Sequence, residues 1–227
     1  MSRKQRRDAQ ETRERLLAAA VEVFAQKGFW ETTHAEICEK AKANIAAVNY
    51  HFGSKENLYV EAWKHAFEES IQAHPPDGGV PANAPVAERL HGHVLALMHR
   101  TADPGNHEIE IMHREMANPT GLLGDAIRRV LEPMRQATVS LVRELLGDGV
   151  GEQQVQFCEM SLISQCFGPM LRMRRDRKAF GPPHPGGPPV HFTVEELADH
   201  VVRFSLAGIR GVREESQGHK KSGRRPK

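Results

Sequence analysis

The residues best suited to chemistry with a partner lie between Asn44 and His51, in the order Asn-Ile-Ala-Ala-Val-Asn-Tyr-His. An asparagine amide pairs with two major-groove groups of adenine, and small apolar side chains contact the methyl group of thymine. A short segment of this composition is therefore suited to the edges of base pairs. The residues that we predict to contact base edges are Ile45, Ala46, Ala47 and Asn49.

Hydroxyl, phenol, imidazole and ammonium groups surround this segment, and such groups bind phosphate oxygens in protein–DNA complexes. Lys55 also lies at a predicted helix start, where backbone N–H groups attract anions. We predict phosphate contacts for Thr33, Tyr50, His51 and Lys55, and Asn44 completes the predicted DNA-binding set. Core packing is the alternative role for the aromatic residues. We expect it for Phe52, whereas both roles stay open for Tyr50 and His51.

Two short helices and the start of a third are expected to position these side chains. Thr33 and Glu36 form a capping box, in which the hydroxyl and the carboxylate each accept a backbone N–H. Asn44 is a favoured N-cap for a helix that ends before Gly53, and Ser54 is a favoured N-cap for the next helix. A helix of this length cannot stabilise itself, so its neighbours must hold it. Two helices joined by a short turn form the helix-turn-helix, whose second helix lies in the major groove.

The sequence gives only weak support for a metal, redox or catalytic site. His107, Glu110 and His113 could supply metal ligands, but their spacing of three drifts around a helix, and we favour ordinary histidines. Cys158 and Cys166 lie two turns apart on an apolar stripe, which favours burial over redox chemistry. The sequence contains no nucleophile elbow, phosphate loop or paired-carboxylate pattern. We therefore predict no metal, no cofactor and no enzymatic activity.

Composition limits the cellular compartment and the partners that the chain can be expected to have. The chain has 227 residues and a formal net charge of +2, so its overall charge does not indicate a nucleic-acid partner. Its three dispersed cysteines fit neither a disulfide framework nor a zinc pattern, which favours a reducing compartment. No apolar run approaches the length needed to span a membrane. These features predict a cytoplasmic protein without a membrane partner.

Both ends of the chain are basic. Residues 3–15 contain six Lys or Arg against three Asp or Glu. Residues 3–10 are either a mobile arm that reaches the minor groove or the phosphates, or a solvated extension of the first helix. The final segment, 218–227, is expected to be a structureless tail, which is either solvated or in contact with phosphates.

Helical periodicity continues through the rest of the chain, with no strand-like alternation after the linker at 74–85. The first helix is expected at about 11–27, followed by Phe29 and Trp30 packed beneath the short helices, and Pro133 is expected to kink or divide a later helix. The predicted all-α fold comprises an N-terminal three-helix helix-turn-helix domain at 1–54, a connecting helix at 55–73, a C-terminal helical ligand-binding and dimerisation domain at 55–214 and a basic disordered tail at 215–227.

The last two predicted helices, at about 152–174 and 193–214, are apolar over most of their circumference. A helix of this kind must be covered on more than one side. A twofold partner would provide the cover, so we predict a homodimer through these two helices. A core formed within one chain is the alternative. The proline-rich segment at 174–192 between them is expected to be a loop.

At these residues the chain resembles the TetR family of bacterial transcription regulators. The resemblance covers about 12–63, from TRERLLAAAVEVFAQKGF onward, and its further matching positions are Thr33, Ile37, Ala41, Asn44, Ala46, Val48, His51, Phe52, Lys55 and Leu58. Residues 44–59 and 114–134 are similar to the CecR-like branch. Lys42 replaces the glycine of the family's turn and must adopt glycine's backbone shape. Asn49 replaces a tyrosine, so the usual phosphate contact there is lost or passes to Tyr50.

The function that we expect is a ligand-responsive transcription regulator, more a repressor than an activator, that binds a palindromic double-stranded DNA operator as a homodimer. A small-molecule effector of unknown identity would release it, and the resemblance implies the dimer helices named above. The alternatives are an activator or DNA-binding protein without a small ligand, and a helical enzyme or carrier whose N-terminal unit is vestigial.

Overall fold

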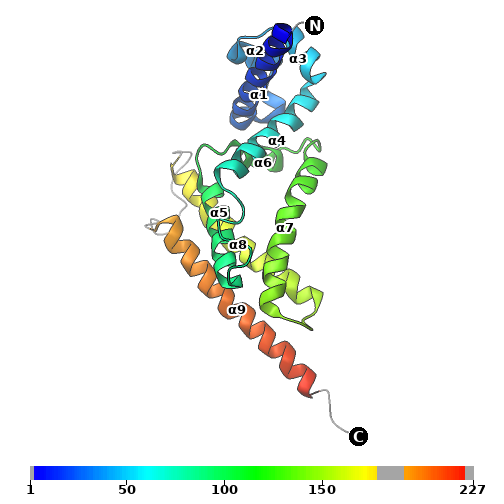
Figure 1. Ribbon diagram of the computed structural model, residues 1–227. Coiled ribbons are helices and arrows are strands. Elements are labelled where there is room, and N and C mark those ends of the chain that lie inside the picture. Colours follow the sequence, from blue (N-terminus) through cyan, green and yellow to red (C-terminus); the bar gives the residue numbers. More distant parts are fainter. Residues whose placement is uncertain (1–2, 178–191, 223–227) are drawn as a thin grey trace. The chain divides into compact units, whose positions relative to one another are not determined.

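The computed structural model describes residues 3–177 and 192–222, and these residues form nine helices and no strand (Figure 1). The all-α prediction is confirmed. The helices are α1 Arg3–Glu31, α2 His34–Ala41, α3 Ile45–Phe52, α4 Lys55–Ala73, α5 Val86–Ala102, α6 His107–Ala117, α7 Gly124–Leu146, α8 Glu152–Arg177 and α9 Val194–Ser222.

The chain forms two compact units. Unit 1 comprises Met1–Ala73 and Pro104–Val130, and unit 2 comprises His74–Asp103 and Leu131–Lys227. Unit 1 therefore joins α4 and α6 to the three predicted helices of the helix-turn-helix, and α7 has residues in both units. The functional division near residue 54 remains a prediction.

The apolar stripe of α1 forms the centre of unit 1. α1 packs against α2, α4 and α6, and Leu16, Ala20 and Phe24 are fully buried. The ring of Phe24 meets that of Tyr59 edge-on at a centroid distance of 4.8 Å, so aromatic contact joins α1 to α4. This stripe therefore forms the core between α1 and its neighbours.

Both ends of α1 extend beyond the expected range 11–27, the N-terminal one in agreement with the helix-extension alternative. The helix begins at Arg3, so residues 3–10 are an extension of the helix and not an irregular arm. Gly28 has φ 77° and ψ −179°, which interrupts the helical backbone before it ends at Glu31. Beyond this interruption Phe29 is buried, but Trp30 is 60% exposed, so the expectation that Trp30 packs beneath the short helices was wrong.

The predicted caps of α2 and α3 are present. Thr33 Oγ1 accepts the backbone N–H of Glu36 at 3.3 Å, and Glu36 Oε2 accepts that of Thr33 at 2.9 Å. Asn44 Oδ1 accepts the N–H of Ala47 at 2.9 Å at the start of α3. Between the two helices Lys42 has φ 51° and ψ 47°, the left-handed conformation that replacement of a glycine requires.

Hydrogen bonds connect the end of α3 to the start of α4. Gly53, with φ 77°, ends α3, and Ser54 Oγ accepts the backbone N–H of Asn57 at 3.2 Å. The side chain of Asn57 donates to the carbonyl oxygen of Phe52 at 3.1 Å, which satisfies one of the last carbonyl groups of α3. The short helix is thus capped at both ends by side chains.

Arg13 of α1 connects three helices. Its guanidinium lies 5.0 Å from the centroid of the Phe52 ring in α3, and it forms an ion pair with Glu61 of α4. A cation over an aromatic face is attracted by the ring quadrupole. Arg13 therefore helps to hold α3 against α1 and α4.

A buried carboxylate joins α4 to α6 within unit 1. Glu115 accepts the hydroxyl of Tyr59 at 3.1 Å and the backbone N–H groups of Thr120 and Gly121 at 2.9 and 3.0 Å. Burial, with the nearby charge of Glu115, raises the pKa of Tyr59. The phenol is therefore kept as a hydrogen-bond donor, and the loop before α7 is tied to the same carboxylate.

In unit 2, α5 packs against both α8 and α9, which also contact each other (Figure 1). Its core contains Leu90, Val94, Met98, Val142, Leu146, Val155, Leu162, Met170, Ala198 and Val201. His93 joins this core with its Nδ1 3.0 Å from the carbonyl oxygen of Pro76 and its Nε2 2.8 Å from Thr138 Oγ1. Burial lowers the pKa of His93.

Two late helices continue further than the sequence predicted, and α7 passes through Pro133 without being divided. α8 extends to Arg177. α9 reaches Ser222, so the tail predicted to be disordered from 215 is helical up to that residue. The rest of that tail, and most of the loop predicted at 174–192, lie outside the described residues.

Replacing Lys42 by glycine is expected to raise the free energy of unfolding of unit 1 by about 1 kcal/mol, because the left-handed conformation costs a non-glycine residue roughly that much. Both tryptophans, Trp30 and Trp63, belong to unit 1, so tryptophan fluorescence during denaturation with urea reports this unit. The control Ala35→Gly, at an exposed helical position, should instead lower the free energy by up to about 1 kcal/mol. A lower midpoint for Lys42→Gly would contradict the strain argument.

Replacing Arg13 by methionine keeps an apolar stem but removes the ion pair and the cation over Phe52. We expect the free energy of unfolding of unit 1 to fall by about 1 kcal/mol, measured by the same fluorescence. Arg128→Met is the matched control, because Arg128 pairs with Asp125 at a largely exposed site and should change stability by less than about 0.5 kcal/mol. Equal small effects of the two variants would exclude a structural role for Arg13.

Candidate nucleic-acid interface

α3 has one buried face and one exposed face. Val48 and Phe52, one turn apart, are 0% and 5% exposed and anchor the helix in unit 1. The four residues of the opposite face are exposed: Ile45, Ala46, Asn49 and Tyr50. These positions follow the i, i+1, i+4, i+5 pattern of a single helical surface. We call this surface the α3 face.

Three of the four predicted base-edge residues lie on the α3 face. Ile45 is 52% exposed, and Ala46 and Asn49 are also exposed, whereas Ala47 is half-buried at its border. Ala47 uses its backbone N–H for the cap provided by Asn44, whose side-chain oxygen is thereby occupied. The α3 face thus offers two apolar side chains, one amide and one phenol.

The predicted phosphate residues surround the α3 face in different environments. Thr33 is exposed, but its hydroxyl accepts the N–H of Glu36 and also lies 3.0 Å from the carboxylate of that residue. Lys27 forms an ion pair with the same carboxylate, and this contact is the main reason why the pKa of Glu36 is lowered to about 2. Thr33 is therefore engaged in capping α2.

Tyr50 and His51, for which both phosphate contact and core packing were open, differ in their exposure. Tyr50 is 68% exposed, so core packing does not explain it. His51 is half-buried, and its ring lies 4.9 Å from that of Tyr50 and 6.2 Å from that of Phe52, measured between centroids. Burial, and secondarily the charge of Arg13, lowers the pKa of His51. These influences favour a neutral imidazole between the α3 face and the core, and the core role expected for Phe52 is confirmed.

Lys55, at the start of α4, is packed against an aromatic ring. Its Nζ lies 4.4 Å from the centroid of Phe29, and burial lowers its pKa. A lysine in this position is oriented by the ring before any anion arrives. The sequence motif predicted a lysine at a helix start, but it gave no indication of the contact with Phe29.

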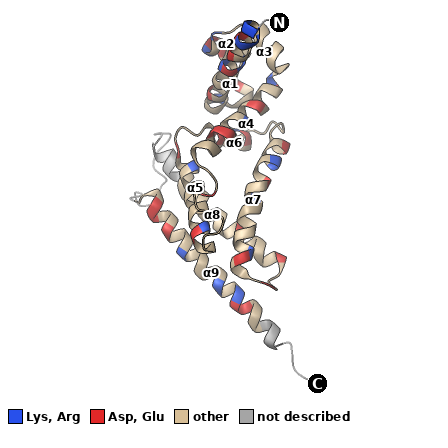
Figure 2. Cartoon of the chain, in the orientation of Figure 1, with Lys and Arg blue, Asp and Glu red and all other residues tan. Residues whose placement is uncertain are grey.

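Charge is absent from α3 itself. The helix contains no Lys, Arg, Asp or Glu and is drawn entirely in tan in Figure 2. Two lysines of α1 and α2 are paired with carboxylates, Lys27 with Glu36 and Lys40 with Glu22, the latter at 2.7 Å. The surface is therefore suited to contact base edges through shape, methyl groups and hydrogen bonds more than through its own charge.

Two positioning residues were missed by the sequence analysis. Asn57 binds the carbonyl end of α3, and Arg13 contacts Phe52, so both orient the α3 face without being part of it. Asn57 could have been found from its place three residues after the N-cap Ser54. Arg13 could not, because its contacts depend on how α1 packs against α3 and α4.

No arrangement suited to a metal was found in the described ranges 3–177 and 192–222, where no three His, Cys, Asp or Glu side chains form a candidate site. In the trio that was considered as metal ligands and not favoured, His107 Nδ1 lies 3.5 Å from a carboxylate oxygen of Glu110. Within the same described part of the chain, no helix is long and apolar enough to cross a membrane.

Comparison with known proteins gives matches over both parts of the chain. Residues 16–62 match the family described as "Bacterial regulatory proteins, tetR family", and residues 86–209 match "HTH-type transcriptional dual regulator CecR, C-terminal domain". The transcriptional regulator AcrR of Shigella flexneri is 38% identical over 64 residues, which cover 28% of this chain and 30% of AcrR. The dual regulator CecR of Shigella flexneri is 27% identical over 172 residues, which cover 69% of this chain and 74% of CecR.

The match to AcrR, like that to the repressor NicS of Pseudomonas putida, spans less than a third of the relative's length. Among solved structures, a TetR-like regulator of Rhodococcus sp. RHA1 has a TM-score of 0.64 at 17% identity, covering 88% of this chain and 96% of that chain. The fatty acid degradation regulator FadR of Bacillus halodurans has a TM-score of 0.62 at 15% identity, covering 86% and 98%. At these identities the structures show a shared fold.

The family matches settle the class of protein. The CecR-type match alone covers more than half of the 227 residues, and the TetR match contains α2, α3 and the start of α4. Members of this family regulate transcription and are not enzymes. The chain therefore belongs to the TetR family of transcription regulators, with a C-terminal domain of the CecR type.

Proposed function

We propose that the chain is a homodimeric transcription repressor that inserts the α3 face of each subunit into the major groove of a palindromic operator. A small-molecule effector bound in the C-terminal domain would favour a dimer that cannot bind DNA. The observation that carries the proposal is the α3 face itself, an uncharged surface on a short helix that is capped at both ends and buried on its other side.

Each predicted residue has a role in this proposal. The methyl groups of Ile45 and Ala46 contact thymine, and the amide of Asn49 pairs with adenine. Ala47 borders the groove, and Asn44 sets the start of α3 beside it. Phosphate oxygens are bound by Tyr50 and Lys55, with Thr33 and His51 at the edges. The two α3 faces of a dimer would be about 34–36 Å apart, one turn of DNA, which requires a palindromic operator.

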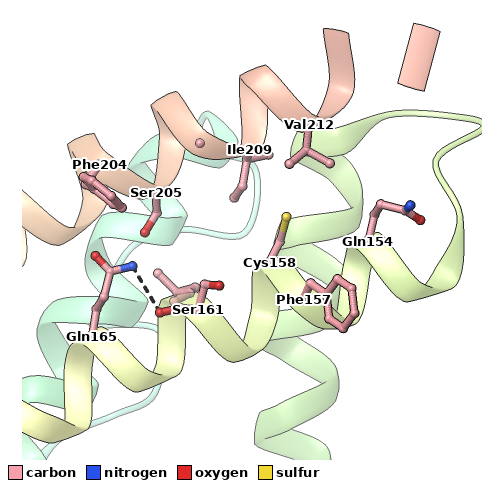
Figure 3. A pocket seen from close by; sticks show the side chains of 11 residues that line it. Gln154, Phe157, Cys158, Ser161, Gln165, Phe204, Ser205, Ile209 and Val212 are labelled. Atoms are coloured by element: carbon pink, nitrogen blue, oxygen red, sulfur yellow. Dashed lines mark hydrogen bonds between the residues drawn. The ribbon is translucent and has the colours of Figure 1, made fainter. Parts of the chain in front are cut away.

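The dimer surface is proposed from an apolar face on α8 and α9. Phe157, Met160 and Phe204 are 57%, 59% and 62% exposed, although they belong to the two helices that the sequence predicted to be covered on more than one side. Phe157 and Phe204 border a groove of about 240 Å³ between the two helices, shown in Figure 3. Large exposed apolar side chains that cluster in this way mark protein interfaces, and a twofold partner would cover them on both subunits.

Repression is inferred from relatives. NicS of Pseudomonas putida is described as a transcriptional repressor, and an Escherichia coli relative, 33% identical over 76 residues, as a probable acrEF/envCD operon repressor. CecR is described as a dual regulator. A dimer that occupies DNA near a promoter represses by excluding the transcription machinery, and this is the activity that we propose.

The effector would act by a population shift. To change operator occupancy from nearly full to nearly empty, it must bind the DNA-incompetent dimer about 10⁴-fold more tightly, which corresponds to roughly 5.5 kcal/mol. No residues are assigned to the effector site. In unit 2, the space beside His93 and Arg100 measures only about 10 Å³, enough for one water molecule.

A second candidate function, which the sequence also leaves open, is a DNA-binding regulator or activator without a small ligand. A thermal-shift screen of the purified dimer against antibiotics, aromatic compounds and fatty acyl compounds separates the two functions. The proposed effector class would raise the melting temperature and release DNA in the same concentration range, whereas the second candidate predicts that no compound does both.

Selection of duplexes from a random pool, followed by footprinting, tests the central proposal. The dimer should enrich a palindrome whose half-sites are centred about one helical turn apart. Failure to enrich any sequence, with the protein folded and dimeric, would overturn the proposed function.

Replacing Lys55 by alanine is expected to weaken binding to all sequences alike and to lower the slope of log K against log salt by about one per subunit. Asn49→Ala should instead cost about 1–3 kcal/mol on the selected operator and relax the preference at one base pair. Binding is measured by fluorescence anisotropy at several salt concentrations. Lys64→Ala, at an exposed position of α4, is the control and should leave the slope unchanged.

Replacing Phe204 by glutamate is expected to convert the dimer into monomers at micromolar concentration, because a charge would be buried at the centre of the proposed interface. The control is Met116→Glu, an equally exposed apolar position in α6 of unit 1, 71% exposed against 62% for Phe204. Analytical ultracentrifugation measures both. Persistence of the dimer in Phe204→Glu, or equal dissociation of the two variants, would contradict the assignment of α8 and α9.

A further inference from the structure

The first turns of α1 lie outside the core of unit 1. Leu16 is the first buried residue of the helix, and every residue from Arg3 to Asp8 is exposed. Ten residues of helix precede Arg13, a length of about 15 Å, and none of them is buried. We call residues 3–12 the basic extension.

Cations dominate this segment. It contains Arg3, Lys4, Arg6 and Arg7, and at 100° per residue these side chains lie within about half of the helix circumference. Arg7 pairs with Glu11 at 2.9 Å, whereas the other three have no acidic partner among the residues that the structure describes. Figure 2 shows these basic residues at the N-terminal end of α1.

The arrangement is unfavourable for the isolated protein. Like charges repel when they are three or four residues apart on a helix, as are Arg3 with Arg6 and Arg3 with Arg7. The first turn contains no acidic residue, so its cations also oppose the positive end of the helix dipole. A row of anions along this side of the helix would offset both costs.

The location of the basic extension favours DNA as the source of those anions. Arg13, the residue that follows the extension, lies 5.0 Å from Phe52 at the C-terminal end of α3. In a helix-turn-helix the N-terminal part of the second helix reads bases, so its C-terminal end lies near the phosphates that border the groove. The extension starts at this end of α3 and continues for about 15 Å.

We propose that the basic extension is a second DNA-contacting surface, which binds backbone phosphates beside the half-site through Arg3, Lys4 and Arg6 and does not read sequence. This inference rests on the proposed function. It assigns to the extension the electrostatic attraction that the uncharged α3 lacks, and it makes the contacted stretch of DNA longer than the bases read by α3.

The test compares the wild-type dimer with the variant Arg3→Gln, Lys4→Gln, Arg6→Gln on the operator selected by the wild type. Each phosphate contact contributes about 0.9 to the salt slope of binding, so the loss of three contacts per subunit should lower the slope by about five for the dimer. Hydroxyl-radical footprinting should show that the variant no longer protects backbone next to the half-sites. The relative affinities for single-base variants of the operator should stay the same.

The control removes the same charge elsewhere in unit 1. Lys64→Gln, Arg128→Gln, Arg129→Gln neutralises three exposed cations of α4 and α7 and should leave slope and footprint unchanged. Neither triple variant alters a buried contact, and tryptophan fluorescence checks that unit 1 remains folded.

Three outcomes would overturn the inference. The slope and the footprint of the extension variant could equal those of the wild type, or the two triple variants could lower the slope equally, which would indicate a general effect of net charge. A changed preference among operator variants would show that the extension reads bases. If the wild type enriches no operator at all, the proposed function itself fails, and that result is distinct from a wild type that binds with an ineffective extension.

Discussion

The structure depends on the contacts that stabilise α3, a helix that is too short to form alone. α3 has eight residues, and an isolated helix of that length is unstable in water because the cost of nucleation is not recovered. Its stability comes from Val48 and Phe52 on the buried side, from the cap at Asn44 and from the hydrogen bond that Asn57 donates to Phe52. Because these contacts use one face and both ends, the remaining face is left exposed and oriented. The proposed reading surface is thus a consequence of how α3 is stabilised.

The same constraint gives unit 1 its composition. Packing of α3 requires α1 and α4, and α4 is in turn fixed by the contact of Tyr59 with Phe24 and by its hydrogen bond to Glu115 of α6. Glu115 also accepts two backbone N–H groups from the loop before α7. A buried carboxylate without these donors would be costly, so the loop, α6 and α4 are stabilised together. Any rearrangement of that loop would change the hydrogen bonding of Tyr59. Tyr59 lies about one helical turn after Lys55, the first residue of α4.

Residues close together in the sequence were sufficient to predict the helices around α3. They did not predict features that depend on contacts between distant helices. The caps at Thr33, Asn44 and Ser54 depend on residues three positions apart, so the sequence contains the whole interaction. The exposed position of Trp30 and the role of Arg13 depend on how distant helices meet, which no spacing encodes. α9 was predicted to end near residue 214, because its polar continuation lacks the apolar periodicity that was used to find helices. The exposure of Phe157 and Phe204 bears on the same limit: a sequence shows that a side chain is apolar, but not whether its own chain covers it.

In the proposed complex, recognition of bases and attraction to the DNA backbone come from different parts of unit 1. Near α3, Lys27, Lys40 and Arg13 are each paired with a glutamate, which reduces their attraction for a polyanion. A formal net charge of +2 for the whole chain adds little long-range attraction. If strong cations surrounded α3, they would bind any duplex and reduce the advantage of the correct sequence, because phosphate contacts carry no sequence information. With α3 uncharged, discrimination can come from base edges in the proposed complex, while the exposed cations of α1 would supply attraction at a distance from them. This separation lets the two properties be altered by different residues, which is why the charge of the extension and the amide of Asn49 have distinct expected signatures.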